Sequence, residues 1–180
     1  MPVSAVETLL RNAVTASGAT AGWIVARAAD GLQVCAYCGP EDPGRYLGAT
    51  FAVAAAGTAG LAAASGQPIA VRPRPGDVLV GQGPMSLLGQ PPACYVSIPC
   101  SDEDGVVGVL EVVDKQAAAS FDIEDIELLS LLGDVAAALL RERGERTVPA
   151  AAPSPLDDLK GRRPAVHRAL IGLIDALGGD

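Results

Sequence analysis

Two pairs of short apolar segments along the chain predict β-hairpins. Residues 22–27 (GWIVAR) and 32–38 (LQVCAYC) flank Asp30–Gly31, a dipeptide that favours the backbone angles of a tight hairpin turn. Residues 93–100 and 106–114 are rich in Val and Ile, and an acidic turn joins them. The pattern therefore predicts two antiparallel hairpins, one in each half of a domain.

Apolar residues spaced by three and four positions predict helices at both ends of this domain. Ser4 and Glu7 match a capping box at the start of the first helix. A long apolar stripe between Ile123 and Leu140 follows Ser120, with carboxylates in the first turns, where the helix dipole favours them. The Ala-rich stretch 51–65 predicts a further helix that ends before Gly66 and Pro68.

A long segment between the two hairpins is expected to be irregular. Residues 69–72 predict a short strand, and the following residues to Pro92 carry five prolines and four glycines. The same segment also carries apolar residues such as Met85 and Leu88. Two interpretations stay open: a lid folded over a binding site, or a loop that covers a sheet edge.

The composition changes abruptly after the last predicted helix. We expect a domain over residues 3–143, a Pro- and Ala-rich linker over 144–156, and an amphipathic tail helix over 157–180. The apolar stripe of this tail helix has no domain around it. It is predicted to dock on its own domain, on a second subunit, or on a protein partner.

Charge and targeting signals narrow the class of protein. The net charge of −8 disfavours nucleic acid as a partner, because phosphate contacts need Lys and Arg, and it also disfavours an anionic membrane surface. No apolar run approaches the ~18 residues of a membrane span. The N-terminal residues do not have the pattern of a secretory signal. We therefore expect a cytoplasmic protein with no membrane partner.

Four cysteines offer redox chemistry or simple packing. Cys35 and Cys38 are three residues apart in a predicted strand, so we expect them to face opposite sides of the sheet. Cys94 and Cys100 are six apart, so they are expected to share a face, and they are the candidates for a thiol-based redox role. The spacings do not match a four-cysteine zinc site, and no metal is expected.

Several motifs, taken in order, resemble a GAF domain from about residue 3 to residue 143. Gly57–Ile69 is similar to the family's glycine-x-x-glycine … glycine-x-proline-hydrophobic run. Pro99 and Gly108–Glu111 match in the second hairpin, and Phe121 with Asp125 opens the final helix.

The resemblance implies an α+β fold, GAF-like and PAS-like, with a central antiparallel sheet. Helices would pack on one face and a ligand pocket would lie on the other. Family members bind cyclic nucleotides, tetrapyrroles, small metabolites or redox centres, and many form homodimers through terminal helices. The cofactor of this chain stays unknown. The candidates for the pocket lining come from the predicted strands, the Ala-rich helix and the loop: Cys35, Phe51, Met85, Tyr95 and Ser97.

A signature of the cyclic-nucleotide-binding members is matched only in part. Lys115, Phe121 and Asp125 agree with it, whereas Asp114 stands where the family has Asn and Ile126 where it has Glu. We therefore expect Lys115 and Asp125 to form a structural ion pair, and we expect another class of ligand.

The residues favour a sensor or interaction module over an enzyme. The only histidine, His167, lies beyond the predicted linker, so neither a nucleophile–histidine pair nor a haem-ligating histidine is expected in the domain. An enzymatic branch of the family reduces free methionine-(R)-sulfoxide. Its cysteine in the Gly-x-x-Gly segment is replaced here by Thr58 and Ala59. The reductase and a thiol-based redox sensor remain the alternatives to ligand sensing.

Overall fold

A computed structural model describes residues 4–147, with side chains described as far as residue 144. A compact unit ends at Arg143, and the last described helix continues to Thr147, into the predicted linker. Most of the predicted linker and the entire predicted tail helix lie outside the described residues.

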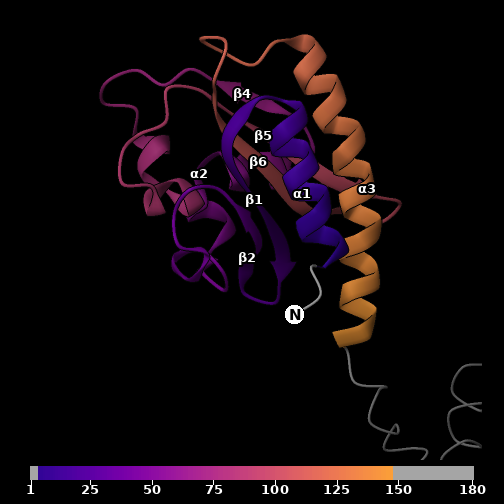
Figure 1. Ribbon diagram of the computed structural model, residues 1–180. Coiled ribbons are helices and arrows are strands. Elements are labelled where there is room, and N and C mark those ends of the chain that lie inside the picture. The colour runs from indigo at the N-terminus through magenta and orange to yellow at the C-terminus, as the bar shows by residue number, and fades with distance from the viewer. Residues whose placement is uncertain (1–3, 148–180) are drawn as a thin grey trace, which may run out of the picture. The chain divides into compact units, whose positions relative to one another are not determined.

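A six-stranded antiparallel sheet forms the centre of the domain (Figure 1). Its strands are β1 (Ala19–Ala28), β2 (Gly31–Cys38), β3 (Thr50–Phe51), β4 (Ile69–Val71), β5 (Tyr95–Asp102) and β6 (Gly105–Lys115). The spatial order is β3-β2-β1-β6-β5-β4. The two predicted hairpins are therefore confirmed, and their first and last strands, β1 and β6, pair at the middle of the sheet.

Three α-helices accompany the sheet: α1 (Ala5–Ala16), α2 (Gly57–Ser65) and α3 (Ile123–Thr147). The capping box of α1 is confirmed: the Ser4 hydroxyl accepts from the Glu7 amide at 3.2 Å, and the Glu7 carboxylate accepts from the Ser4 amide at 2.9 Å. The Ala-rich helix was predicted too early in the sequence. Thr50 and Phe51 extend the sheet beside β2 instead, and the helix begins only at Gly57.

The helices α1 and α3 lie on the same face of the sheet (Figure 1). Leu10 from α1 and Leu129 from α3 are fully buried against Ile24 and Leu110 of the central strands. Gly108 of β6 makes this approach close, because a Cβ there would lie 2.6 Å from a Leu140 methyl group. We refer to this side as the helix face.

The opposite face is covered by α2 and by the loop of residues 72–92, which we call the lid loop. The lid loop is not irregular throughout, because it contains the 3-10 helices η3 (Val78–Gly81) and η4 (Gly83–Leu87). Val80 and Met85 are buried in the core on this side. We refer to this side as the α2 face.

A β-bulge corrects the predicted orientation of two cysteines. Ile24 pairs with Ala36 and Val25 pairs with Val34, so Cys35 has no partner in the ladder. The extra residue shifts the alternation of β2 by one position. As a result Cys35 and Cys38 both pack toward the helix face rather than on opposite sides.

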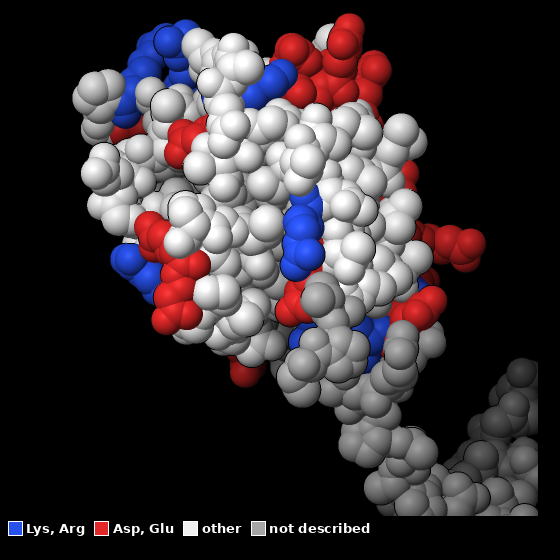
Figure 2. Space-filling model, viewed as in Figure 1, with Lys and Arg blue, Asp and Glu red and all other residues white. Residues whose placement is uncertain are grey.

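Charged side chains lie mainly around the periphery of the view in Figure 2, with a broad uncharged area between them. An acidic group at the upper right marks the start of α3, where Glu124 and Asp125 occupy the first turn. None of the described helices is long and apolar enough to cross a membrane.

Candidate functional site

A buried carboxylate lies at the centre of the α2 face. Glu111 of β6 is fully buried, and three side chains donate hydrogen bonds to it. The Trp23 indole N–H donates to Oε2 at 2.6 Å, and the hydroxyls of Ser97 and Thr58 donate to Oε1 at 2.5 and 3.3 Å. Three different elements, β1, β5 and α2, therefore converge on one carboxyl group.

The surroundings of Glu111 favour its neutral form. Burial raises the pKa of this carboxyl, and the hydrogen bonds from Ser97, Trp23 and Thr58 only partly oppose that effect. The nearby Tyr95 hydroxyl is buried and forms no hydrogen bond of regular geometry with the described residues. Burial likewise raises the pKa of Tyr95, while the neighbouring Thr58 lowers it. Such buried polar groups are costly to stability and tend to occur at functional positions.

A stack of aromatic rings leads away from this cluster. The Trp23 ring stacks on Tyr46 with centroids 6.0 Å apart, and Tyr46 stacks on Tyr37 at 4.0 Å with the ring planes 9° apart. The Tyr46 hydroxyl contacts the Glu41 carboxylate at 3.1 Å and the Leu87 carbonyl at 3.4 Å. Tyr46 therefore connects the buried cluster with the lid loop and with Glu41.

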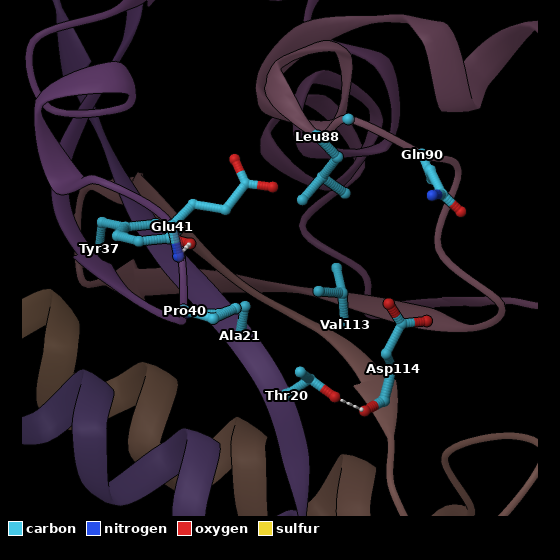
Figure 3. A pocket seen from close by; sticks show the side chains of 10 residues that line it. Thr20, Ala21, Tyr37, Pro40, Glu41, Leu88, Gln90, Val113 and Asp114 are labelled. Atoms are coloured by element: carbon cyan, nitrogen blue, oxygen red, sulfur yellow. Dashed lines mark hydrogen bonds between the residues drawn. The ribbon is translucent and has the colours of Figure 1, made fainter.

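An open cavity of about 320 Å³ lies at the far end of this stack (Figure 3). Its wall comes from the ends of β1, β2 and β6, from residues 40–41, and from the lid loop. The lining residues are Thr20, Ala21, Tyr37, Pro40, Glu41, Leu88, Gly89, Gln90, Val113 and Asp114. Leu88 extends into the cavity from the lid loop, and Val113 extends into it from the sheet. The carboxylates of Glu41 and Asp114 lie near its rim.

The predicted lining residues separate into two groups. Phe51, Met85, Tyr95 and Ser97 belong to the core of the α2 face or to its polar cluster. None of these four residues is among those that line the open cavity. Cys35 lies on the helix face, where its thiol donates to the Ile24 carbonyl at 3.4 Å. The bulge that reorients Cys35 is the reason it does not face the predicted pocket.

The candidate redox cysteines occupy the core of the helix face. Cys94 and Cys100 are both buried there. Six residues of extended chain separate them by roughly 20 Å, which is beyond the reach of a disulfide. Burial raises the pKa of the Cys100 thiol to about 12, so its reactive thiolate form is disfavoured.

Lys115 and Asp125 form an ion pair that ties the end of β6 to the start of α3. The Lys115 ammonium also contacts Asp122 at 3.4 Å. The hydrogen bond that the Lys115 ammonium donates to the Asp125 carboxylate is the main cause that raises the pKa of Lys115. Within residues 4–144, no group of three or more His, Cys, Asp and Glu side chains could hold a metal ion.

Sequence reasoning missed the central residues of the site. Glu111 was noticed only as part of a family motif, although it is a lone carboxylate inside an apolar strand, which is itself a signal of a buried polar role. The protein has only one Trp and three Tyr residues, so the position of each was a possible indicator of the site. The stacking of Trp23, Tyr46 and Tyr37 depends on a loop conformation that periodicity does not encode.

Comparison with solved structures supports the fold. The GAF-B domain of DevS from Mycobacterium smegmatis is 20% identical, with a TM-score of 0.59 over 78% of this chain and 93% of that one. The GAF domain of a phosphoenolpyruvate-protein phosphotransferase (ptsP) from Coxiella burnetii is 16% identical, with a TM-score of 0.67 over 81% and 85%. At these identities the likeness concerns the fold alone.

An enzyme is also among the similar structures. The type II free methionine-R-sulfoxide reductase from Thermoplasma acidophilum is 16% identical, with a TM-score of 0.58 over 76% of this chain and 89% of that one. No curated protein matches the sequence. The family model described as GAF domain matches residues 3–141, so the chain belongs to the GAF domain family, as its sequence motifs predicted.

Proposed function

We propose that this protein is a small-molecule sensing module whose ligand binds in the cavity at the end of the aromatic stack. The observation that carries the proposal is the cavity itself, about 320 Å³, between the sheet and the lid loop. Its volume lies at the lower end of the range for small-ligand pockets. The lining combines apolar side chains such as Leu88 and Val113 with polar ones such as Thr20 and Gln90, and polar groups of this kind fix the orientation of a small ligand.

The lid loop supplies a means of response to the ligand. Leu88, Gly89 and Gln90 line the cavity, and the neighbouring Leu87 carbonyl contacts the Tyr46 hydroxyl. A ligand that contacts this segment stabilises the arrangement in which the lid loop is closed. The ligand shifts the equilibrium between the open and closed arrangements of the lid loop by the difference in its binding free energy for the two.

The proposed output runs through the terminal helices. Leu128, Leu131 and Val135 of α3 are exposed, and their spacing of three and four residues matches the apolar seam of a coiled coil. We propose that two copies pair along this stripe and that the tail helix binds a protein partner. The net charge of −8 disfavours nucleic acid and anionic membranes as partners, and the proposed location is the cytoplasm.

The oligomeric part of the proposal is tested by light scattering during size-exclusion chromatography. Leu131→Glu should convert a dimer into a monomer, because it places a carboxylate in the apolar seam. Glu103→Gln, in the exposed β5–β6 turn, serves as the control and should remain dimeric. A monomeric wild-type protein would contradict the proposed homodimer.

The ligand proposal is tested by native followed by denaturing mass spectrometry of the full chain, purified without added ligand. Gly89→Phe places a ring on a residue that lines the cavity and should obstruct ligand binding, and the backbone need not shift because nothing lies within 4 Å of a Cβ at Gly89. Gly81→Phe is the matched control, since Gly81 lies in the same loop, is equally unobstructed and does not line the cavity.

The expected result is extra mass in the wild type and in Gly81→Phe that is absent from Gly89→Phe. If the wild type carries no extra mass, and a metabolite library gives no thermal shift that Gly89→Phe removes, the sensing proposal fails. Thiol-based redox sensing and methionine sulfoxide reduction are less well supported, because burial raises the pKa of Cys35 to about 11 and of Cys100 to about 12.

A further inference from the structure

The two charged residues that line the cavity, Glu41 and Asp114, are both acidic, and Glu41 is paired with Arg45 at 3.0 Å. Glu41 and Asp114 are the carboxylates among its lining residues, and none of the lining residues is Lys, Arg or His. The two carboxylates come from different walls, one from the segment after β2 and one from the end of β6 (Figure 3). An anionic ligand would therefore be repelled most strongly by Asp114, because Arg45 partly offsets the charge of Glu41.

Asp114 is held in place by its backbone. Its φ of 56° is the one positive value among the described non-glycine residues. Its N–H donates to the Cys94 carbonyl at 2.8 Å, and its carbonyl accepts from the Thr20 hydroxyl at 2.8 Å. A left-handed residue held by several hydrogen bonds marks a position where the protein sustains backbone strain.

Only one of the two oxygens of the Asp114 carboxylate accepts a hydrogen bond from the described residues. Oδ1 accepts from the Ala93 amide at 2.6 Å, and none of the residues in the described part of the chain donates a hydrogen bond to Oδ2. The adjacent Lys115 is engaged with Asp122 and Asp125 instead. Oδ2 therefore remains available at the rim of the cavity as an oriented anionic acceptor.

Glu41 is arranged in a similar way. Its Oε2 accepts from Arg45 at 3.0 Å and from the Tyr46 hydroxyl at 3.1 Å. The Arg45 side chain of this ion pair is half exposed, and such ion pairs contribute little to the stability of a protein. The interactions fix the position of the Glu41 carboxylate while its Oε1 accepts no hydrogen bond from the described residues.

We propose that the cavity selects a small organic cation, with an ammonium or guanidinium group at Asp114 Oδ2 and an apolar body against Leu88 and Val113. This inference rests on the proposed sensing function and specifies its ligand class. The negative net charge of the chain adds a long-range attraction for such a ligand. The Glu41 carboxylate supplies a second contact for a cation with more than one donor.

The test uses three shape-related probes, each titrated at low salt into the full chain and followed by ligand-observed NMR. They are phenethylammonium, 3-phenylpropionate and 3-phenylpropanol. The expected result is that phenethylammonium binds at least about tenfold more tightly than the other two. Asp114→Asn should weaken its binding about tenfold, because Asn keeps the left-handed backbone and the Ala93 hydrogen bond but loses the charge.

Asp30→Asn is the matched control, because it removes one charge from the exposed β1–β2 turn, outside the cavity. It should leave the affinity for phenethylammonium within about twofold. Equal binding of the three probes, no binding of phenethylammonium, or equal losses in Asp114→Asn and Asp30→Asn would overturn the cation assignment.

The two proposals fail in different ways. If the wild type carries bound mass that Gly89→Phe removes and phenethylammonium does not displace it, the cavity binds a ligand of another class. In that case the sensing function stands and the cation assignment falls. If neither bound mass nor probe binding depends on Gly89→Phe, both proposals fail.

Discussion

The two faces of the sheet use the same strands for different purposes. Along β6, Leu110 and Val112 point to the helix face and pack against aliphatic side chains of α1 and α3. Val109 and Val113 point to the α2 face, and between them lies Glu111 with its three hydrogen-bond donors. One strand therefore presents a purely apolar side and a side with a buried ionisable group.

This difference indicates where stability and binding are located. The helix face gains free energy from the burial of aliphatic surface, at roughly 25 cal/mol per Å². The α2 face loses part of that gain, because it buries Glu111 and a Tyr95 hydroxyl that has no hydrogen-bond partner among residues 4–144. Substitutions on the helix face should therefore be the more damaging ones, whereas some substitutions on the α2 face should stabilise the protein.

The largest effect is expected for Leu129→Asp on the helix face. Leu129 is fully buried, so the change places an unpaired carboxylate in an apolar core. We expect a loss of at least about 4 kcal/mol in the free energy of unfolding, measured by urea denaturation. Leu61→Asp is the matched control, because Leu61 of α2 is 47% exposed and lies outside the proposed dimer seam. Similar urea unfolding curves for the two variants would show that the Leu129 side of α3 does not form part of the core.

A moderate effect is expected for Gly108→Val. Even a Cβ at Gly108 would lie 2.6 Å from both a Leu140 methyl group and the Val25 carbonyl, so α3 must move away from the sheet. Overpacking of this kind costs about 1–3 kcal/mol, which thermal unfolding followed by circular dichroism will detect. Gly81→Val, where nothing lies nearby, should be nearly neutral. An unchanged melting temperature for Gly108→Val would refute the close contact between α3 and β6.

A smaller effect of opposite sign is expected for Glu111→Gln on the α2 face. Because burial raises the pKa of Glu111, the folded state binds this proton more tightly than the unfolded chain does. The contribution of Glu111 to stability is therefore fully present below its ordinary pKa of 4.5 and is lost as the pH rises through the elevated folded value. Gln keeps the shape and stays neutral, so it avoids this loss.

We expect Glu111→Gln to melt a few degrees above the wild type at pH 8, with the difference shrinking toward pH 4. Differential scanning calorimetry across this range provides the measurement. Glu103→Gln, in the exposed turn, should show no such trend. A Glu111→Gln variant that is less stable at pH 8 would mean that the ionised carboxylate is the favoured form.

The smallest effect concerns reactivity rather than stability. Burial raises the pKa of Cys35 to about 11 and that of Cys100 to about 12. Iodoacetamide at pH 8 should therefore modify both thiols at least about tenfold more slowly in the folded protein than in guanidinium chloride. Peptide mass spectrometry identifies the modified sites. Equal rates of modification in the folded and the denatured protein would mean that these thiols are reactive, and would support thiol-based redox sensing.

Local signals allowed the framework to be predicted from the sequence. Asp30–Gly31 carries its own turn chemistry, and Ser4 with Glu7 carries its own cap, so neither depends on distant residues. The bulge at Cys35 could not be predicted, because it results from how β2 pairs with β1 across the sheet. One unpaired residue was enough to reverse the predicted face of a strand end.

The site was harder to predict than the fold for the same reason. Trp23, Thr58, Ser97 and Glu111 come from four separate elements, and only the folded topology brings them within hydrogen-bond distance. Tyr95 and Ser97 were among the predicted lining residues as members of a predicted strand, and Ser97 does donate to Glu111. The open cavity depends on the path of the lid loop, for which composition predicts irregularity but not position.

The single tryptophan gives the protein a built-in optical reporter. Trp23 donates its indole N–H to Glu111 and stacks on Tyr46, so its fluorescence emission should respond to the charge on that carboxyl group. Tyr46 in turn stacks on Tyr37 at the cavity wall, and excitation of these tyrosines should transfer energy to Trp23. Ligand occupancy and the protonation state of the core can therefore be followed in solution without any added label.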